Sequence, residues 1–543
     1  RTAQTAEERF AYHRTAKHWR WIEVQSTETG RMTSLQPREE LARVERLAGR
    51  PAESAPIYRE LADALPVGVA RSNHRRREFE TLLATGDRQA ALEALEGALE
   101  AVGERYTTSS VIQKFSELKN RAVAAMNRWS EELDDAVHQP LGGTETLHLK
   151  LFRHIILKND ILDSRRGVRF RSKFSALAER SKDALLLGYD RLFLARDCHT
   201  TGLDERPDRA EAWYEETEAL FERAGEPVGE AHLAIGRARL RRNRGDFGAA
   251  DRCLDLASSR LGRCPDIPER ERYLVAAERA EVERQRGNLE RAIRRASALR
   301  HLHRGNQLAV FRANQVLLPT HLLRGEIDQA EIVIEQCQSF IGDEPPCVAN
   351  VWLARQTLRL NLALGRPEVA RGQLDVLDEQ LHRSGLIDHP YVSVVFPLSR
   401  AQALIALLTR KQHIGESRRR SLYKRIQADV TAVRNRDPRL VPWLESESER
   451  LLARFALLKD DLDTAYDHLQ QATNWLSNFP NPIARSMCAE ATGLIFRESN
   501  PTQGTSLLEQ SRVVYDHADC HFPLVLEGWP VPQRLASLQA DEA

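Results

Sequence analysis

The feature that most constrains the fold of this chain is a turn glycine followed, five residues later, by an alanine. The pattern occurs in four stretches, RGDFGAADRCLDLA (244–257), RGNLERAIRRASAL (286–299), RGEIDQAEIVIEQC (324–337) and LGRPEVARGQLDVL (364–377). The four glycines lie 42, 38 and 40 residues apart. Apolar residues at helical spacing precede and follow each glycine, so each unit is predicted to be a helix–turn–helix.

Two amphipathic helices cannot cover their own apolar faces, so neighbouring units must stack on one another. Glycine accepts the left-handed backbone that ends the first helix, and alanine lets the two helices approach closely where they cross. Strand signals are almost absent, because no Asn-Gly turn lies between alternating apolar runs. We therefore predict an all-α protein, an α-solenoid superhelix of stacked helix–turn–helix repeats.

Further copies of the pattern extend the array in both directions. Good matches are Gly86 with Ala91 and Asp460 with Ala465, and weaker ones are Gly49 with Ser54 and Ser499 with Gly504. Two stretches rich in turn formers, 138–150 and 197–213, are predicted loops or joints. The chain is thus divided into an N-terminal helical region with repeats (1–140), an irregular helical joint (141–210), regular repeats (211–380) and C-terminal repeats with a cap (381–543).

The units around 245–257 and 460–472 resemble tetratricopeptide repeats at the turn glycine and at the Ala, Leu and Ala of the second helix. The period near forty is more similar to the looser repeats in the tails of large LuxR-family regulators and related bacterial signalling ATPases. This resemblance implies an array that binds peptides or helices of partner proteins. Arg237 and Arg241 stand where the family has large apolar and aromatic residues in the first helix.

Bulk composition indicates a soluble protein of a reducing compartment. Acidic and basic residues nearly cancel, at 78 and 79, so no global charge favours nucleic acid or anionic lipid. The seven cysteines lack C-x-x-C spacing and are predicted to be buried, small apolar residues. The N-terminal stretch is too charged for a secretory signal, and the apolar stretch 391–408 is broken by Pro397 and Arg400, which argues against a membrane span. We expect a bacterial cytoplasmic location.

No motif for catalysis, nucleotide binding or metal binding is recognisable, so we expect no enzyme activity, cofactor or metal. Arg512 and His517 have the R-x-x-x-x-H spacing of helical HEPN-type ribonucleases, a spacing that many helices contain by chance. His301 and His303 are interpreted as solvated turn residues because no carboxylate or cysteine at helical spacing completes a ligand set.

Charge on one predicted face is the more informative feature. Between residues 231 and 324 there are 20 basic and 10 acidic residues. If the first helix of each unit lines the concave side, the repeat register places the following residues there: His232, Arg239, Arg242, Asn243, Glu281, Arg284, Gln285, Arg312, Gln315, Trp352, Arg355 and Arg359. Such a groove suits recognition of carboxylate or phosphate. The alternative interpretation is the solvated face of an arginine-rich protein. The predicted partner-binding residues are this set without His232 and Glu281.

These features predict a non-catalytic scaffold or regulatory subunit that binds an acidic or extended segment of a partner protein along a basic concave groove. A second hypothesis is a component of a bacterial defence or stress-signalling system, acting as substrate, inhibitor or adaptor with a partner protease, nuclease or ATPase. A third is nucleic-acid binding through the basic grooves, which would depend steeply on salt.

Overall fold

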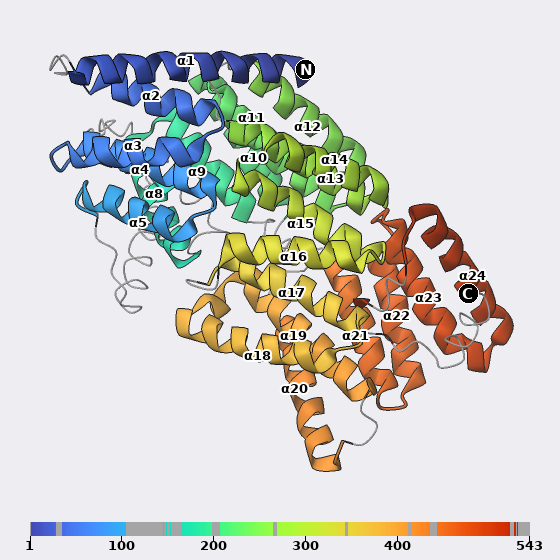
Figure 1. Ribbon diagram of the computed structural model, residues 1–543. Helices are drawn as coiled ribbons and strands as arrows, with labels where there is room; N and C mark the ends of the chain where they lie inside the picture. Colours follow the sequence, from blue (N-terminus) through green and yellow to red (C-terminus); the bar gives the residue numbers. More distant parts are fainter. Residues whose placement is uncertain are drawn as a thin grey trace, which may run out of the picture.

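The protein, seen as a computed structural model, is built of α-helices joined mostly by short turns (Figure 1). The structure describes residues 2–28, 35–104, 145, 148, 152–153, 164–197, 207–263, 269–342, 346–410, 414–434, 442–521, 526–527 and 529. No β-strand occurs within these ranges, which confirms the predicted all-α class.

Most of the described helices pack against the next helix along the chain. The N-terminal helices are α1 (Thr2–Glu28), α2 (Gln36–Leu47), α3 (Pro51–Asp63), α4 (Val69–Thr85) and α5 (Arg88–Glu100). The next group is α8 (Ser164–Ser181), α9 (Ala184–Asp197) and α10 (Pro207–Ala224). The regular repeats are the pairs α11 (Pro227–Asn243) and α12 (Phe247–Gly262), α13 (Glu269–Gln285) and α14 (Leu289–Leu302), α15 (Gln307–Leu323) and α16 (Ile327–Ile341), and α17 (Val348–Ala363) and α18 (Pro367–Ser384).

The C-terminal part continues the helical array. A short 3-10 turn, η2 (Leu386–Asp388), leads into α19 (Pro390–Arg410) and α20 (Glu416–Arg434). The last pairs are α21 (Pro442–Leu457) with α22 (Leu462–Trp475), and α23 (Pro482–Ser499) with α24 (Pro501–Ala518).

The turn glycines have the backbone conformation that the repeat pattern predicts. The φ angles of Gly245, Gly287, Gly325 and Gly365 are +82°, +89°, +71° and +67°. Asp460 takes the same place in the unit of α21 and α22 with a φ of +59°, which few residues other than glycine adopt. The alanines five residues after these glycines are 1% exposed or less. The helix–turn–helix interpretation of the repeats is therefore confirmed.

The apolar stretch at 391–408 forms helix α19, which continues through Pro397. By length and composition alone α19 could cross a membrane, but 89% of its most apolar window is buried inside the protein, as in a core helix of a soluble fold. Its Arg400 is held by ion pairs with Asp378 of α18 and Asp429 of α20. Tertiary packing on both sides thus stabilises a helix that contains a proline.

The predicted loop at 197–213 is also wrong at its end, because α10 begins at Pro207. Proline lacks the N–H that a first helical turn leaves unsatisfied, so it is compatible with that position. Residues 198–206 of this loop, and most of the other predicted loop at 138–150, lie outside the described residues. The boundaries of the predicted joint stay a prediction.

The array bends back far enough to contact itself. The Arg88 side chain at the start of α5 donates to the carbonyl of Ile341 at the end of α16, over 2.8 Å. The turn at Gly245 packs on Phe479 and Pro480, and the turn at Gly287 packs on Pro482. In Figure 1 the C-terminal helices α22 and α23 accordingly lie beside the regular repeats rather than continuing away from them.

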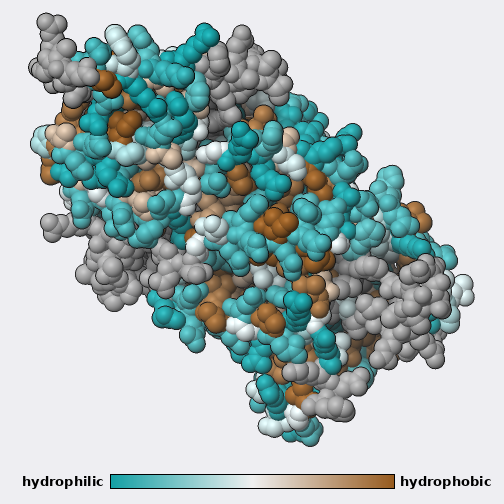
Figure 2. All heavy atoms as spheres, in the orientation of Figure 1, coloured by the Kyte–Doolittle hydropathy of each residue, from teal (hydrophilic) through white to brown (hydrophobic). Residues whose placement is uncertain are grey.

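The face of the molecule seen in Figure 2 is mostly hydrophilic. Figure 2 shows hydrophilic residues over most of the visible face, with apolar residues in small separate groups. Several of the large exposed apolar side chains belong to second helices of units, among them Leu256 of α12, Ile332 of α16 and Val376 of α18. Scattered apolar residues of this kind are normal on protein surfaces.

Candidate functional site

The first helices of successive units, α11, α13, α15 and α17, contact one another in order and form one layer of the array. The predicted partner-binding arginines lie on this layer, and a charged series continues onto α21. We call the series the inner-face strip; it consists of Arg239, Arg242, Glu278, Glu281, Arg284, Arg312, Arg355, Arg359, Glu447, Arg450 and Arg454.

The strip begins with two arginines of α11 that share one carboxylate of α13. Arg239 Nε and Arg242 Nη1 lie 2.7 and 2.6 Å from the two carboxylate oxygens of Glu278. Burial alone would raise the pKa of Glu278, but the two guanidinium groups outweigh it and hold that pKa below its usual value. Asn243 accepts a long hydrogen bond of 3.4 Å from Arg242.

Further along α13, Glu281 accepts hydrogen bonds from two residues of its own helix. Arg284 contacts it with two nitrogens, at 2.8 and 2.6 Å, and Gln285 donates to it over 2.8 Å. On α15, Arg312 Nη1 donates to Gln315 Oε1 over 2.8 Å. Burial opposes the charge of Glu281, yet Arg284 keeps the pKa of this carboxyl below its usual value.

The strip then continues from α17 to α21. Arg355 of α17 is 4% exposed and pairs with Glu447 of α21, two units later, while Arg359 lies 3.5 Å from the same oxygen. Burial and the neighbouring Arg355 together lower the pKa of Arg359. Glu447 thus joins α17 to α21 within the strip.

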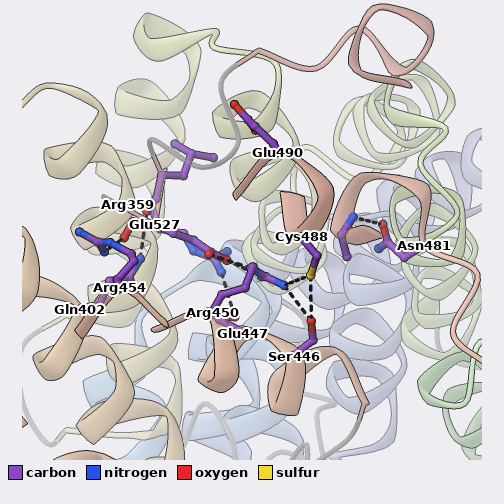
Figure 3. Close-up of polar contacts among 12 residues, drawn as sticks. Arg359, Gln402, Ser446, Glu447, Arg450, Arg454, Asn481, Cys488, Glu490 and Glu527 are labelled. Atoms are coloured by element: carbon purple, nitrogen blue, oxygen red, sulfur yellow. Dashed lines mark hydrogen bonds and ion pairs between the residues drawn. The ribbon is translucent and has the colours of Figure 1, made fainter. Parts of the chain in front are cut away.

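Beyond α24, Glu527 contacts the strip. Arg450 of α21 makes a two-pronged contact with the carboxylate of Glu527, at 2.9 and 2.5 Å (Figure 3). Arg454 donates to the backbone carbonyl of Glu527, and Gln402 of α19 donates to that of Leu526 over 3.1 Å. Burial lowers the pKa of Arg454 to about 9, although the Glu527 carboxylate counteracts this effect.

The remaining predicted residue, Trp352, is half-buried rather than a free aromatic surface. Its ring packs edge-on against Phe311, with 6.0 Å between centroids, and belongs to the edge of the main apolar core. The structure thus brings the predicted arginines into one series, but sets many of them in ion pairs within the chain. Partner binding by Arg239, Arg242, Asn243, Arg284, Gln285, Arg312, Gln315, Trp352, Arg355 and Arg359 stays a prediction.

Sequence reasoning missed Glu278, Glu447, Arg450, Arg454 and Glu527. The recognised unit of Asp460 and Ala465 was the available signal for α21, since extending the register back one helix places 442–457 on the same layer. No local signal pointed to Glu527, which lies outside the repeats.

The other residues singled out in the sequence lie on α24 and at the end of α14. Arg512 and His517 are both exposed on α24. His301 is exposed at the end of α14, whereas His303 packs its ring against Tyr273 at 6.1 Å and is therefore not a freely solvated turn residue. Among the described residues, no group of three or more histidine, cysteine or acidic side chains could hold a metal ion.

The described cysteines largely fit the prediction of small buried residues. Cys337, Cys347, Cys488 and Cys520 are buried, while Cys253 is half-buried. Burial raises the pKa of both Cys337 and Cys520 to about 12, so neither thiol is reactive at neutral pH.

Comparison with known proteins assigns no family. No protein-family model matches the chain, and a search of curated proteins finds no match. Among solved structures, the crystal structure of the APC/C hetero-tetramer Cut9-Hcn1 matches with a TM-score of 0.46 and 11% identity, covering 95% of this chain and 88% of that chain. The structure of Naa15/Naa10 bound to HypK-THB matches with a TM-score of 0.23 and 13% identity, covering 93% and 82%. The all-α repeat fold of this chain rests on its own helices.

Proposed function

We propose that the chain is a non-catalytic scaffold or regulatory subunit that binds an acidic, extended segment of a partner protein along the inner-face strip. The observation that carries the proposal is the sharing of carboxylates. Arg239 and Arg242 both pair with Glu278, and Arg355 and Arg359 both contact Glu447. Each shared carboxylate neutralises only one of its two guanidinium groups, so positive charge remains along the strip.

Two properties of this charge favour a carboxylate-bearing partner. Guanidinium groups present a planar fork of donors that matches carboxylate geometry. The side chains of Arg239, Arg242, Arg284 and Arg359 keep between 14% and 22% of their surface exposed, which leaves them within reach of a segment lying on the strip. Arg355 is buried and would instead contribute its charge and support the position of Glu447.

The test uses two substitutions with opposite expected effects on one ion-pair group. A fluorescein-labelled 12-residue glutamate-rich peptide is titrated with the full chain, and binding is followed by anisotropy. We expect Arg242→Gln to weaken binding about three- to tenfold, because one donor fork is lost. Glu278→Gln should strengthen it by a similar factor, because the competing carboxylate inside the chain is removed.

Arg294→Gln is the matched control, since this arginine of α14 is 65% exposed and pairs with Glu290 of its own helix. It removes the same charge elsewhere and is expected to change binding less than twofold. If all three variants bind the peptide as tightly as the wild type does, the strip is not the recognition surface. The same holds if neither the wild type nor any variant binds the peptide.

The more specific hypotheses keep their own tests. A role in bacterial defence or stress signalling, in the cytoplasm, predicts processing or regulation by a partner protease, nuclease or ATPase. Kinship with the tails of LuxR-family regulators would support that setting. Nucleic-acid binding predicts retention on heparin with a steep salt dependence.

A further inference from the structure

Three residues near the end of the chain are buried in the array although they belong to no repeat. Beyond α24, the backbone N–H of His521 donates to the carbonyl of Leu323 at the end of α15, over 2.8 Å. Leu526, Glu527 and Trp529 are then 5% or 6% exposed. We call these three residues the docked tail.

The docked tail is held in the manner of a bound peptide. Gln402 and Arg454 donate to the main-chain carbonyls of Leu526 and Glu527, contacts that do not depend on the side chain of the tail. Arg450 donates two hydrogen bonds to the Glu527 carboxylate. Such a combination of main-chain contacts with side-chain pockets is how proteins recognise extended segments.

The apolar residues on either side of Glu527 enter separate cores. Leu526 joins the main core cluster, which includes Leu317 and Leu353, while Trp529 joins the C-terminal cluster with Met487 and Ala491. The guanidinium of Arg454 lies 6.0 Å from the centre of the Trp529 ring. The docked tail thus presents an apolar residue, an acid and an aromatic residue in that order.

The two arginines of the site are buried in the array. Arg450 is 3% exposed and Arg454 is 2% exposed, and Arg450 is oriented by Ser446 at 2.9 Å and by the Cys488 sulfur at 3.6 Å (Figure 3). Glu447 of the same helix also offsets the charge of Arg450, but the carboxylate that acts on Arg454 is Glu527. A buried guanidinium without a carboxylate nearby is costly, so an acidic occupant stabilises the site.

The tail does not satisfy the site fully. The indole N–H of Trp529 is buried and has no hydrogen-bond acceptor among the described residues. In addition, Glu490 of α23 is buried near Glu527, and burial together with this neighbouring carboxylate raises the pKa of Glu490 to about 7. An unsatisfied donor and a nearby acid both reduce the stability of the docked tail.

We propose that Gln402, Arg450 and Arg454 form a peptide-recognition site for a partner segment of the type Leu-Glu-x-Trp, and that the docked tail occupies this site until such a segment displaces it. The proposal rests on the proposed function, because it names the type of segment that the C-terminal end of the inner-face strip takes. In the free protein, the docked tail then competes with the partner segment for this site.

The experiment uses the full chain with Glu527→Ala and Trp529→Ala together, which removes two side chains of the docked tail from the site. We call this double variant the opened chain. The probe is a fluorescein-labelled peptide of residues 524–532, LVLEGWPVP, followed by anisotropy. We expect the opened chain to bind the probe at least tenfold more tightly than the wild type, whose own tail competes at the high effective concentration of a tethered segment. A probe with glutamine in place of its glutamate should bind at least tenfold more weakly.

Arg450→Lys in the opened chain tests the two-pronged contact while keeping the charge. It should weaken binding of the probe severalfold, and Arg450→Gln should weaken that binding further. Circular dichroism of each variant checks that the helices persist. Equal binding of the probe to the wild type and the opened chain would overturn the proposal. The glutamate-rich peptide, run in parallel, reports on the strip itself, so loss of that signal alone refutes the proposed function and not the tail site.

Discussion

Glu490 shows at the residue scale how the inside of the array sets the charge state of a single group. Its carboxylate accepts a hydrogen bond from the Tyr515 hydroxyl over 2.8 Å, which favours the charged form, but burial outweighs this bond. The pKa in the native protein is about 7, against an ordinary value of 4.5. The native state therefore keeps a proton on this group at pH values where the unfolded chain has released it.

This difference predicts a pH-dependent stability. Between about pH 4.5 and 7 the native state holds the additional proton, so the contribution of Glu490 to stability is complete below that window and is lost as the pH rises through it. We expect Glu490→Gln to flatten the fall in urea-unfolding midpoint between pH 5 and 8. Glu290→Gln on the exposed face of α14 serves as control, and an unchanged slope in the Glu490 variant would refute the argument.

At the scale of elements, the helix starts of the repeats differ in how they are capped. Asp246 precedes α12 and accepts the backbone N–H of Ala249 over 2.9 Å, and Asp461 does the same for Thr464 before α22. Arg366 occupies the corresponding place before α18 and makes no side-chain cap. The same turn is thus completed by different chemistry in different units.

The capping difference can be measured. Asp246→Ala should destabilise the first turn of α12 by about 1 kcal/mol, because the N–H of Ala249 loses its acceptor. Arg366→Ala removes a side chain at the equivalent position without removing a cap and should have a much smaller effect. Hydrogen exchange of the first turns of α12 and α18 in the full chain would check both, and equal changes would contradict the assignment of the cap.

The elements themselves could largely be predicted from the sequence. Glycine and alanine at fixed spacing report a backbone turn and a helix crossing, which are local properties, and the structure confirms them even where Asp460 replaces glycine. The course of α19 through Pro397 was not predictable, because its stability comes from burial against the neighbouring helices α17, α18 and α20, which a local pattern does not report. The start of α10 at Pro207 was missed because a proline signals a helix start as readily as a loop.

At the scale of the whole molecule, contacts between distant repeats decide which parts of the inner layer are covered. The arginines of α11 to α17 could be placed from their register. Their partners on α21 and in the docked tail could not, because Glu447 and Glu527 lie 88 and 77 residues from the arginines that they meet, Arg359 and Arg450. A repeat pattern describes neighbouring units and carries no information on which units meet again after the array turns.

The contact at Gly245 gives a prediction at this scale. A Cβ on Gly245 would lie 2.4 Å from Pro480 Cδ and 3.2 Å from the Cα of Phe479, whereas a Cβ on Gly49 would meet nothing within 4 Å. Both glycines have positive φ, at +82° and +76°, so alanine strains the backbone at both by about 1–2 kcal/mol. We expect Gly245→Ala to lower the melting temperature clearly more than Gly49→Ala. Equal shifts would mean that the two parts of the array do not depend on this contact.

The packing of the Gly245 and Gly287 turns on residues 479–482 has a consequence for how such a chain can change in length. An open array can gain or lose a unit anywhere, since each unit meets only its neighbours. Here an additional helix pair between residues 287 and 479 would rotate the later units away from the turns on which they now rest. Duplication or deletion of a unit should therefore be rejected between these turns and residues 479–482, and better tolerated among the N-terminal helices α1 to α3, which precede the contact of Arg88 with Ile341.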